Sequence, residues 1–410
     1  MTHVQTAIVV GGGIAGAVTA MALQRAGIEA TVHEAYAKAA DGVGGMLGLA
    51  PNGLDALAAI DLDGPVRHVA EPVSAMVVQS WTGKRLAQVD DPCGKPIMHV
   101  VWRPDLYRAL YDEARRRGIT IEHSHRFIDA RESGDGVTAR FSDDSTARAD
   151  ILIGADGSRS TVRSMIDPTA PPPRYTGLLG LGGLTRRAGV DSTNANYRMI
   201  FGKKAFFGYE VSDEGQISWF ANLPHRDPLT LAQAREVSPE EWLRILSDAF
   251  AADRTPADAI IAATSPADLM VIGGLEIMPT APVWSRGRSV IVGDAAHVPS
   301  PSSGQGASMA IESAIELARC LRDLPYAQAF AAYENLRRDR VTRIIKLAAR
   351  TNNHKAAGPI ARRLRDVIMP IAMKLAKPEK TAWQYNHHID WDAPATNTIT
   401  RRPRLMSGRV

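Results

Sequence analysis

The residues best placed to do chemistry early in the chain are closely spaced glycines and a carboxylate that follows them. Gly11, Gly13 and Gly16 give the spacing G-x-G-x-x-G between an apolar, β-branched run and a segment with helical periodicity. Such spacing allows a tight turn, close approach of the backbone to a pyrophosphate, and close packing of helix on strand. Glu34, 18 residues beyond Gly16, can accept hydrogen bonds from both hydroxyls of a ribose.

The helix that begins after this turn complements a negative charge. Its first N–H groups, including those of Ile14 and Ala15, lack partners within the helix, and the helix dipole favours an anion there. The pattern therefore predicts that residues 11–16 bind a dinucleotide. By itself it does not distinguish NAD from FAD.

A second motif, residues 154–160, follows another buried strand and contains a short acid between small residues. Asp156 could hold a ribose or orient the local amides, and Arg159 could offer charge to a phosphate. A plain turn after a strand is the alternative for this motif when it is taken alone.

A third motif begins at Gly293 and again places Gly-Asp after a buried strand. Asp294 can accept a hydrogen bond from a ribitol hydroxyl. The turn from Gly304 to Gly306 leads into a helix whose N–H groups could face the pyrimidine edge of a flavin, which becomes negative on reduction. Prolines within this motif, Pro301 among them, would form a stiff wall beside the ring.

These motifs require a doubly wound α/β domain with an inserted, mostly antiparallel sheet and C-terminal helices. Strands are predicted at Thr6–Val10, Ala30–His33, Ala149–Ile153 and Ser289–Val292, and helices at Ile14–Arg25, Pro104–Arg117, 305–321, Tyr326–Arg350 and Ile360–Leu375. We expect a discontinuous FAD-binding domain over 1–172 and 286–325, a substrate-binding β-sheet domain over 173–285, a helical region over 326–392, and a mobile tail over 393–410. The inserted domain would lie over the cofactor crevice.

Composition narrows the class of protein. The chain has 410 residues, 45% hydrophobic and 22% charged, with a net charge of +4. Its scattered basic residues lack interleaved aromatics, so nucleic-acid binding is not expected. Two cysteines without a motif, no targeting signal and no membrane span predict a cytoplasmic protein. No metal site is predicted, and both a monomer and a homodimer fit the sequence.

Taken together, the three motifs resemble the p-hydroxybenzoate hydroxylase family, the class A flavoprotein monooxygenases. The family pattern A-D-G-x-R-S-x-x-R is matched from Ala155 to Arg163, and G-D-A-A-H-x-x-x-P-x-x-G-Q-G is matched from Gly293 to Gly306. The resemblance implies FAD, with NADPH or NADH as transient electron donor and molecular oxygen as co-substrate. It implies hydroxylation or epoxidation of a hydrophobic, aromatic or polycyclic small molecule through a flavin C4a-hydroperoxide.

The resemblance also implies individual roles. Arg103, at the start of a helix, corresponds to an FAD-contacting arginine, and Gly48 falls where the family's chain passes the flavin. The backbone of Phe127 falls where adenine is recognised, and Ala307 should lie near the flavin ring. Asp156 falls in a motif that serves both FAD and NAD(P)H.

The sequence identifies substrate contacts and acid–base residues less well. Phe207, Tyr209 and Trp219 could line an aromatic pocket, although strand alternation would place some of them in the core. His297 could be a catalytic base or a packed loop residue, so the catalytic residue is unknown. A flavin-dependent halogenase, an oxidase or dehydrogenase, and a non-catalytic flavin-binding redox sensor are the alternatives.

Overall fold

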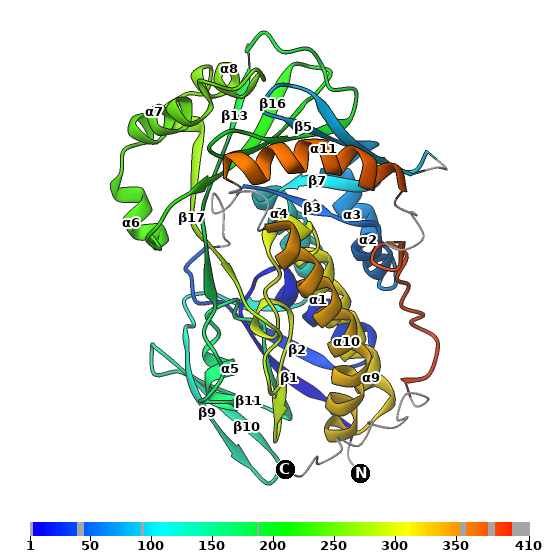
Figure 1. Cartoon of the computed structure of the whole chain (residues 1–410). Coiled ribbons are helices and arrows are strands. Elements are labelled where there is room, and N and C mark those ends of the chain that lie inside the picture. The colour runs from blue at the N-terminus through cyan, green and yellow to red at the C-terminus, as the bar shows by residue number, and fades with distance from the viewer. Residues whose placement is uncertain are drawn as a thin grey trace, which may run out of the picture.

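The computed structural model describes residues 3–38, 45–91, 94–186, 188–352, 358–375 and 382–395 (Figure 1). In these described residues, four sheets and their covering helices make up a mixed α/β fold, which confirms the predicted fold class. Within the described residues, no helix has both the length and the apolar character needed to cross a bilayer.

The first sheet positions the motifs found in the sequence. Its strands, in spatial order, are β18 (Ser285–Arg286), β19 (Ser289–Ile291), β12 (Ile151–Gly154), β1 (Thr6–Val10), β2 (Glu29–His33) and β8 (Thr120–Glu122). All pairs are parallel except that of β18 with β19. Because β1, β12 and β19 are neighbours and run in the same direction, the three loops that follow them emerge at one edge.

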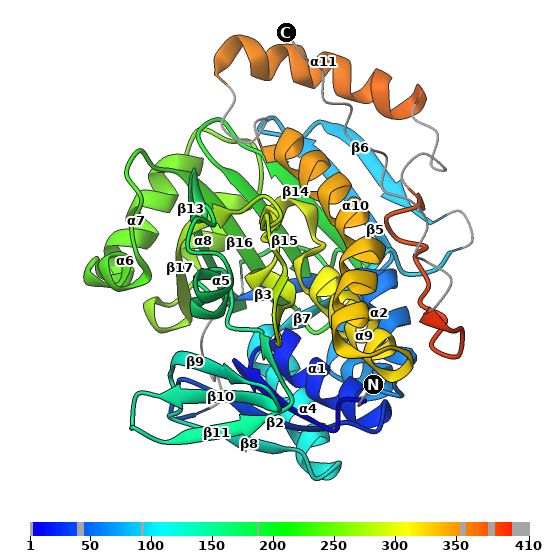
Figure 2. The same ribbon diagram turned by 90° about the horizontal axis from the view of Figure 1, so that it is seen from below.

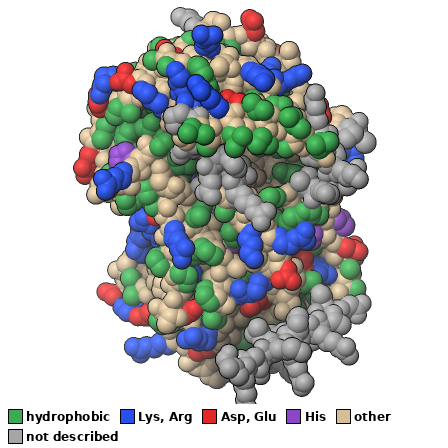
Figure 3. Space-filling model, viewed as in Figure 1, with side chains coloured by type: hydrophobic (Ala, Val, Ile, Leu, Met, Phe, Trp, Pro, Cys, Tyr) green, Lys and Arg blue, Asp and Glu red, His purple; other side chains and the backbone are tan. Residues whose placement is uncertain are grey.

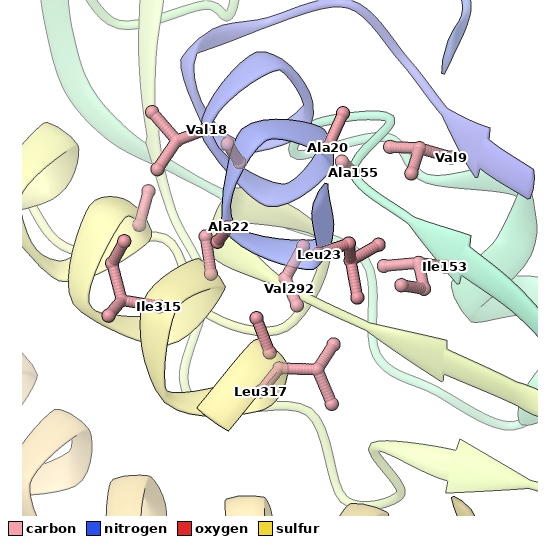
Figure 4. Packing of buried hydrophobic residues seen from close by; sticks show 14 of the residues in the cluster. Val9, Val18, Ala20, Ala22, Leu23, Ile153, Ala155, Val292, Ile315 and Leu317 are labelled. Carbon is pink, nitrogen blue, oxygen red and sulfur yellow. The ribbon is translucent and has the colours of Figure 1, made fainter. Parts of the chain in front are cut away.

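Layers cover both faces of this sheet. On one face, α1 (Ile14–Arg25) packs against α9 (Gly306–Asp323), which in turn packs against α10 (Tyr326–Asn352). The other face is covered by an antiparallel sheet of β9 (Phe127–Ser133), β10 (Gly136–Phe141) and β11 (Thr146–Ala149) (Figure 2). Small residues such as Ala20 and Ala22 allow the α1 backbone to approach its neighbours, and larger side chains such as Leu23 and Ile315 fill the remaining core (Figure 4).

The largest sheet lies beyond this core. Its strands, in order, are β17 (Leu269–Ile277), β13 (Arg174–Arg186), β16 (Gln216–Pro224), β15 (Phe206–Val211), β14 (Asn196–Phe201), β5 (Ala75–Ser80) and β6 (Arg85–Asp90). The helices α6 (Leu231–Glu236), α7 (Pro239–Phe250) and α8 (Ala257–Ala262) and the short η1 (Pro266–Asp268) follow β16 in the chain. The predicted substrate domain over 173–285 remains a prediction. Its sheet also takes in β5 and β6 from earlier in the chain.

A third antiparallel sheet connects the two larger ones. It contains β3 (Met46–Leu49), β7 (Met98–Trp102) and β4 (Ala70–Val73), and β3 leads into α2 (Pro51–Ala58). The remaining elements are α3 (Asp63–His68), α4 (Arg103–Arg116), α5 (Thr161–Ile166), η2 (Gly293–Ala295), η3 (Pro301–Ser303) and α11 (Pro359–Leu375). Of the predicted tail, Ala393 and Ala395 are held by Arg319 and Asp323 of α9, and residues 396–410 lie outside the described residues.

Candidate active site

The three motif loops converge at one edge of the parallel sheet. Val10 pairs with Gly154, and Gly154 pairs with Ile291. The amide of Ala155 donates to the carbonyl of Val10 at 2.8 Å, and that of Val292 donates to the carbonyl of Gly154 at 2.9 Å. Stretches that are far apart in sequence therefore form one continuous wall, as the motifs predicted.

Steric constraints explain two glycines of the first loop. Gly11 has φ +99°, and a Cβ there would lie 2.6 Å from the carbonyl oxygen of Ala155. A Cβ on Gly16 would lie 1.8 Å from the carbonyl oxygen of Gly11. No side chain fits at either position, so the loop requires glycine there for its own fold.

Gly13 differs, and it tests whether the loop fits a dinucleotide. A Cβ at Gly13 would meet nothing closer than the Tyr107 hydroxyl at 3.6 Å, an ordinary contact, and its φ of −67° suits any residue. The protein alone therefore does not require glycine at this position. A ligand that approaches the backbone would, and the pyrophosphate of FAD is such a ligand.

Two helix N-termini at this edge are also open to an anion. Neither α1 nor α9 has a side-chain cap or an acidic residue in its first turn. Gly13 and Ile14 of the first turn, and Gly306 and Ala307 of the second, retain accessible surface. Their unpaired N–H groups fit a pyrophosphate and the electron-rich edge of a flavin.

Glu34 stiffens the first loop from the end of β2. Its carboxylate accepts hydrogen bonds from the amides of Gly12 at 2.6 Å and Tyr36 at 3.0 Å. The hydroxyl of Tyr111 in α4 donates to the carbonyl oxygen of Gly12 at 2.9 Å. The amide of His125 donates to the carbonyl of Glu34 at 2.9 Å, which brings the strand containing Phe127 alongside. The proposed adenine-side role of the Phe127 backbone remains a prediction.

Arg103 and Asp294 lie near enough for each charge to influence the pKa of the other. Burial raises the pKa of Asp294 to about 6, and the positive charge of Arg103 opposes that shift. Arg103 also donates to the hydroxyl of Tyr107 at 3.1 Å. Both charged side chains retain accessible surface although burial is the largest influence on each pKa. That combination is expected of side chains that line a concave ligand site, and Asp294 is free to accept from a hydroxyl.

Asp156 orients local amides. It accepts hydrogen bonds from the Ser160 hydroxyl at 2.5 Å and from the amides of Thr161 and Val162 at 2.7 and 3.1 Å. The sequence allowed Asp156 either to hold a ribose or to orient local amides. The structure shows the second, because Asp156 positions the amides at the start of α5. Arg159 pairs instead with Glu276 at 2.8 Å.

Arg163 links the second and third motifs, which the sequence pattern alone did not explain. Its guanidinium donates to the carbonyl oxygens of Ser158 at 2.7 Å and Ala295 at 3.1 Å. The final Arg of the A-D-G-x-R-S-x-x-R pattern thus holds the loops of the second and third motifs in register.

A buried polar cluster supports the third motif from behind. The Asn52 amide donates to Gln305 at 3.0 Å and to Glu312 at 2.6 Å. Fully buried His297 contacts the Ser313 hydroxyl at 3.0 Å, and burial together with Arg337 lowers its pKa to about 3. His297 is therefore a neutral, packed loop residue.

The remaining predicted residues lie around this cluster. Gly48, at which a Cβ would lie 2.1 Å from Met98, precedes α2, and α2 packs on α9. Gly304 has φ +60° and directly precedes the N-cap of α9. Pro301 is exposed in η3. Contact of each with a ligand remains a prediction.

The three aromatic residues predicted to contact substrate lie elsewhere. Phe207, Tyr209 and Trp219 are buried in a cluster with Trp242 and Phe250 of α7. Strand alternation places all three on the sheet face that the helices cover, which we call the helix face. All three therefore pack against the helices there, and their predicted contact with substrate remains a prediction.

The opposite face of the same sheet, the inner face, faces β3 and β7. Phe220 and Met199 of this face pack with Met46 and Met98. A Cβ at Gly45 would meet Met270 at 3.4 Å and Ile272 at 3.6 Å. Phe220, Met270 and Ile272 retain accessible surface. The sequence analysis did not identify these three residues. Phe220 could have been identified, because it follows Trp219 in a strand and its side chain must point to the opposite face.

Comparison with known proteins agrees with this geometry. The family model described as "FAD binding domain" matches residues 3–348. A 3-amino-4-hydroxybenzoate 2-monooxygenase from Streptomyces platensis is 31% identical over 94% of this chain and 98% of its own length. An FAD-dependent urate hydroxylase from Klebsiella pneumoniae is 29% identical over 83% of this chain and 87% of its own. The structure of K. pneumoniae HpxO with FAD and uric acid has a TM-score of 0.79 and 25% identity, covering 92% of this chain and 94% of that one.

The fold and the three convergent loops define a flavoprotein of the class A monooxygenase type. The chain belongs to the FAD-binding domain family. It is an FAD-dependent oxidoreductase, and its relatives are monooxygenases.

Proposed function

We propose that this enzyme uses NADPH or NADH and molecular oxygen to hydroxylate a planar, predominantly apolar aromatic molecule. When bound, FAD supplies the oxygen-activating chemistry, and the chain supplies binding, orientation and exclusion of water. Residues 11–16, Glu34, Arg103, Asp156 and Asp294 would hold the cofactor. The converged motif wall is the observation that carries this proposal.

The inner face supports the substrate class. Among its partly accessible side chains, Phe220, Met270 and Ile272 are apolar and lie beside the start of β3. Gly180 and Gly182 on the neighbouring strand β13 carry no side chain, and the side chains of Ile272 and Met270 lie beside them. An apolar surface suits an aromatic ring, and the relatives named above are a 3-amino-4-hydroxybenzoate 2-monooxygenase and a urate hydroxylase.

Substrate-stimulated turnover tests the proposal. The purified protein should be yellow and should oxidise NADPH or NADH faster when a suitable phenol, hydroxybenzoate or fused-ring heterocycle is present. Mass spectrometry after turnover under ¹⁸O₂ should find one labelled oxygen in the product. Peroxide release without labelled product across such a panel would favour an oxidase, and flavin binding without any turnover would favour a redox sensor.

Cellular setting and assembly are further parts of the proposal. With two cysteines in 410 residues, the chain is suited to the reducing cytoplasm, where NADPH, NADH and oxygen are all available. The three motif loops belong to one chain, which supports a cofactor site that is complete in a monomer. Activity that is independent of protein concentration would support a functional monomer.

A further inference from the structure

The helix α11 exposes its apolar side to solvent. Along its length, apolar side chains recur at helical spacing and are half or more exposed: Ile360 85%, Leu364 58%, Val367 62%, Ile368 50%, Ile371 58% and Leu375 77%. We call these six residues the α11 stripe. Figure 3 shows a row of hydrophobic side chains across the upper part of the molecule, where α11 runs in Figure 1.

The inward side of α11 is the more polar one. Arg365 is buried against the ring of Phe201, with its guanidinium 4.3 Å from the ring centroid, and it pairs with Asp366 at 2.7 Å. Arg362 donates to the carbonyl of Lys203 at 2.5 Å, and Met369 packs against Phe201 and Phe206. A surface helix ordinarily turns its apolar side inward. These contacts hold α11 with its more polar side toward the protein, and the α11 stripe therefore faces solvent.

The basic side chains near the α11 stripe favour a negatively charged partner. The one acid in the sequence of α11, Asp366, is paired with the buried Arg365, so it does not offset the charge of Arg363. Arg363 is exposed beside the stripe. At the β14–β15 turn, the ammonium of Lys203 lies 4.5 Å from the ring centroid of Trp81. An apolar helix side with basic and aromatic neighbours is suited to the headgroup region of a negatively charged bilayer.

A second copy of the chain fits this surface less well. Seventeen residues of helix span about 25 Å, and a stripe ~10 Å wide offers roughly 250 Å². Stable interfaces bury about 800 Å² on each partner. Two copies would also bring positively charged helices together.

We infer that α11 docks this enzyme on the surface of an anionic lipid bilayer. The helix lies in the plane of the interface, with the α11 stripe among the acyl chains and Arg363 at the phosphates. Because Met369 packs on Phe206 of the inner face, the docked enzyme holds its aromatic-binding sheet close to the membrane. An apolar substrate dissolved in lipid would then be accessible; this last point alone rests on the proposed function.

Vesicle flotation of the FAD-loaded full chain tests the inference. The probes are vesicles of phosphatidylcholine alone and of phosphatidylcholine mixed with phosphatidylglycerol. We expect binding to the mixed vesicles that weakens with added salt. The double variant Leu364→Gln, Ile371→Gln should lower the partition coefficient by at least about tenfold, because two apolar side chains leave the acyl region. Arg363→Gln should weaken binding and reduce its salt dependence.

Controls separate this result from misfolding and from self-association. Ile128→Gln, at an apolar position on β9 that is 40% exposed, should bind vesicles as the wild type does. Flavin content and NAD(P)H oxidation without vesicles should be equal in all variants, and they report independently on the proposed function. Equal flotation of the stripe variant and the wild type, or no flotation of either, would overturn the inference. Sedimentation equilibrium showing a dimer that only the stripe variant loses would overturn it in favour of a contact between copies.

Discussion

Glu312 of α9 and Arg337 of α10 form a fully buried ion pair, 2.5 Å between carboxylate oxygen and guanidinium nitrogen. Arg340 also donates to Glu312, at 2.8 and 2.9 Å, and the two arginines hold the pKa of Glu312 at about 2 even though burial opposes ionisation. The same carboxylate accepts from Asn52, beside the N-terminus of α9. Through Asn52, which also bonds Gln305, the pair therefore fixes the start of α9.

Removing the Glu312 carboxylate should destabilise the folded protein. We expect Glu312→Gln to lower the free energy of unfolding by about 3–5 kcal/mol, because two buried guanidinium groups lose their partner. Urea denaturation of the apoprotein measures this change. Glu241→Gln, which removes the exposed partner of Arg244, should have no measurable effect. Equal stabilities of the two variants would contradict a structural role for the buried pair.

Two glycine substitutions should separate folding from cofactor binding. Gly16→Ala should reduce both the yield of folded protein and flavin content, since its Cβ would collide with the Gly11 carbonyl. Gly13→Ala should leave thermal stability close to that of the wild type but weaken FAD binding by an order of magnitude or more, because a methyl group occupies the approach to the pyrophosphate. The control is Gly64→Ala in α3, where a Cβ meets nothing within 4 Å. Normal flavin affinity in Gly13→Ala would remove the pyrophosphate from this position.

Asp294→Ala should weaken FAD binding by roughly ten- to hundredfold, the range for one hydrogen bond to a charged group. Titration of the apoprotein with FAD, followed by quenching of flavin fluorescence, gives the dissociation constant. Asp268→Ala, an exposed change in η1, provides the comparison. An unchanged dissociation constant would exclude Asp294 from the site.

The two faces of the large sheet should respond differently to loss of an aromatic ring. Phe207→Ala, on the helix face, should lower the free energy of unfolding by about 3–5 kcal/mol because a fully buried ring is lost. Phe220→Leu, on the inner face, should keep flavin content and change the KM for the aromatic substrate severalfold. A changed KM in a folded Phe207→Leu enzyme with no change in Phe220→Leu would reverse the assignment of the faces.

Glu210 should make stability depend on pH near neutrality. Burial, and next the carboxylate of Glu71, raise the pKa of Glu210 to about 7. The folded state therefore holds this proton more tightly than the unfolded state does, and stability decreases as pH rises through that range. Glu210→Gln should flatten the decrease between about pH 5 and about pH 8 and so should be relatively more stable at the higher pH. Glu214→Gln, in the turn after β15, should keep the wild-type slope.

The local sequence pattern was enough to predict that the loops of the three motifs converge in the motif wall. Gly11, Gly154 and Gly293 each end a buried strand, and parallel strands bring such ends to one edge, so three separate motifs implied one site. The first helix and the strands around it follow from the same periodicity. The resemblance to a known family then supplied the cofactor, which spacing alone had left open.

Long-range pairing and the choice between faces could not be predicted in the same way. Alternation shows that Trp219 and Phe220 point to opposite faces, but it does not show which face the helices cover. The partners of Glu312 lie on another helix, and nothing local in the sequence couples them. The membership of β5 in the large sheet depends on its pairing with β14, which no nearby residue specifies.

The pairing of β5 with β14 has a consequence for folding of the nascent chain. On the ribosome, β5 and β6 emerge long before β14, the strand that completes their hydrogen-bonding ladder, has been synthesised. Until then the nascent hairpin presents an open edge, which is a template for association with other chains. Synthesis that pauses before residue 196 therefore leaves the edge of β5 unpaired and open to other chains.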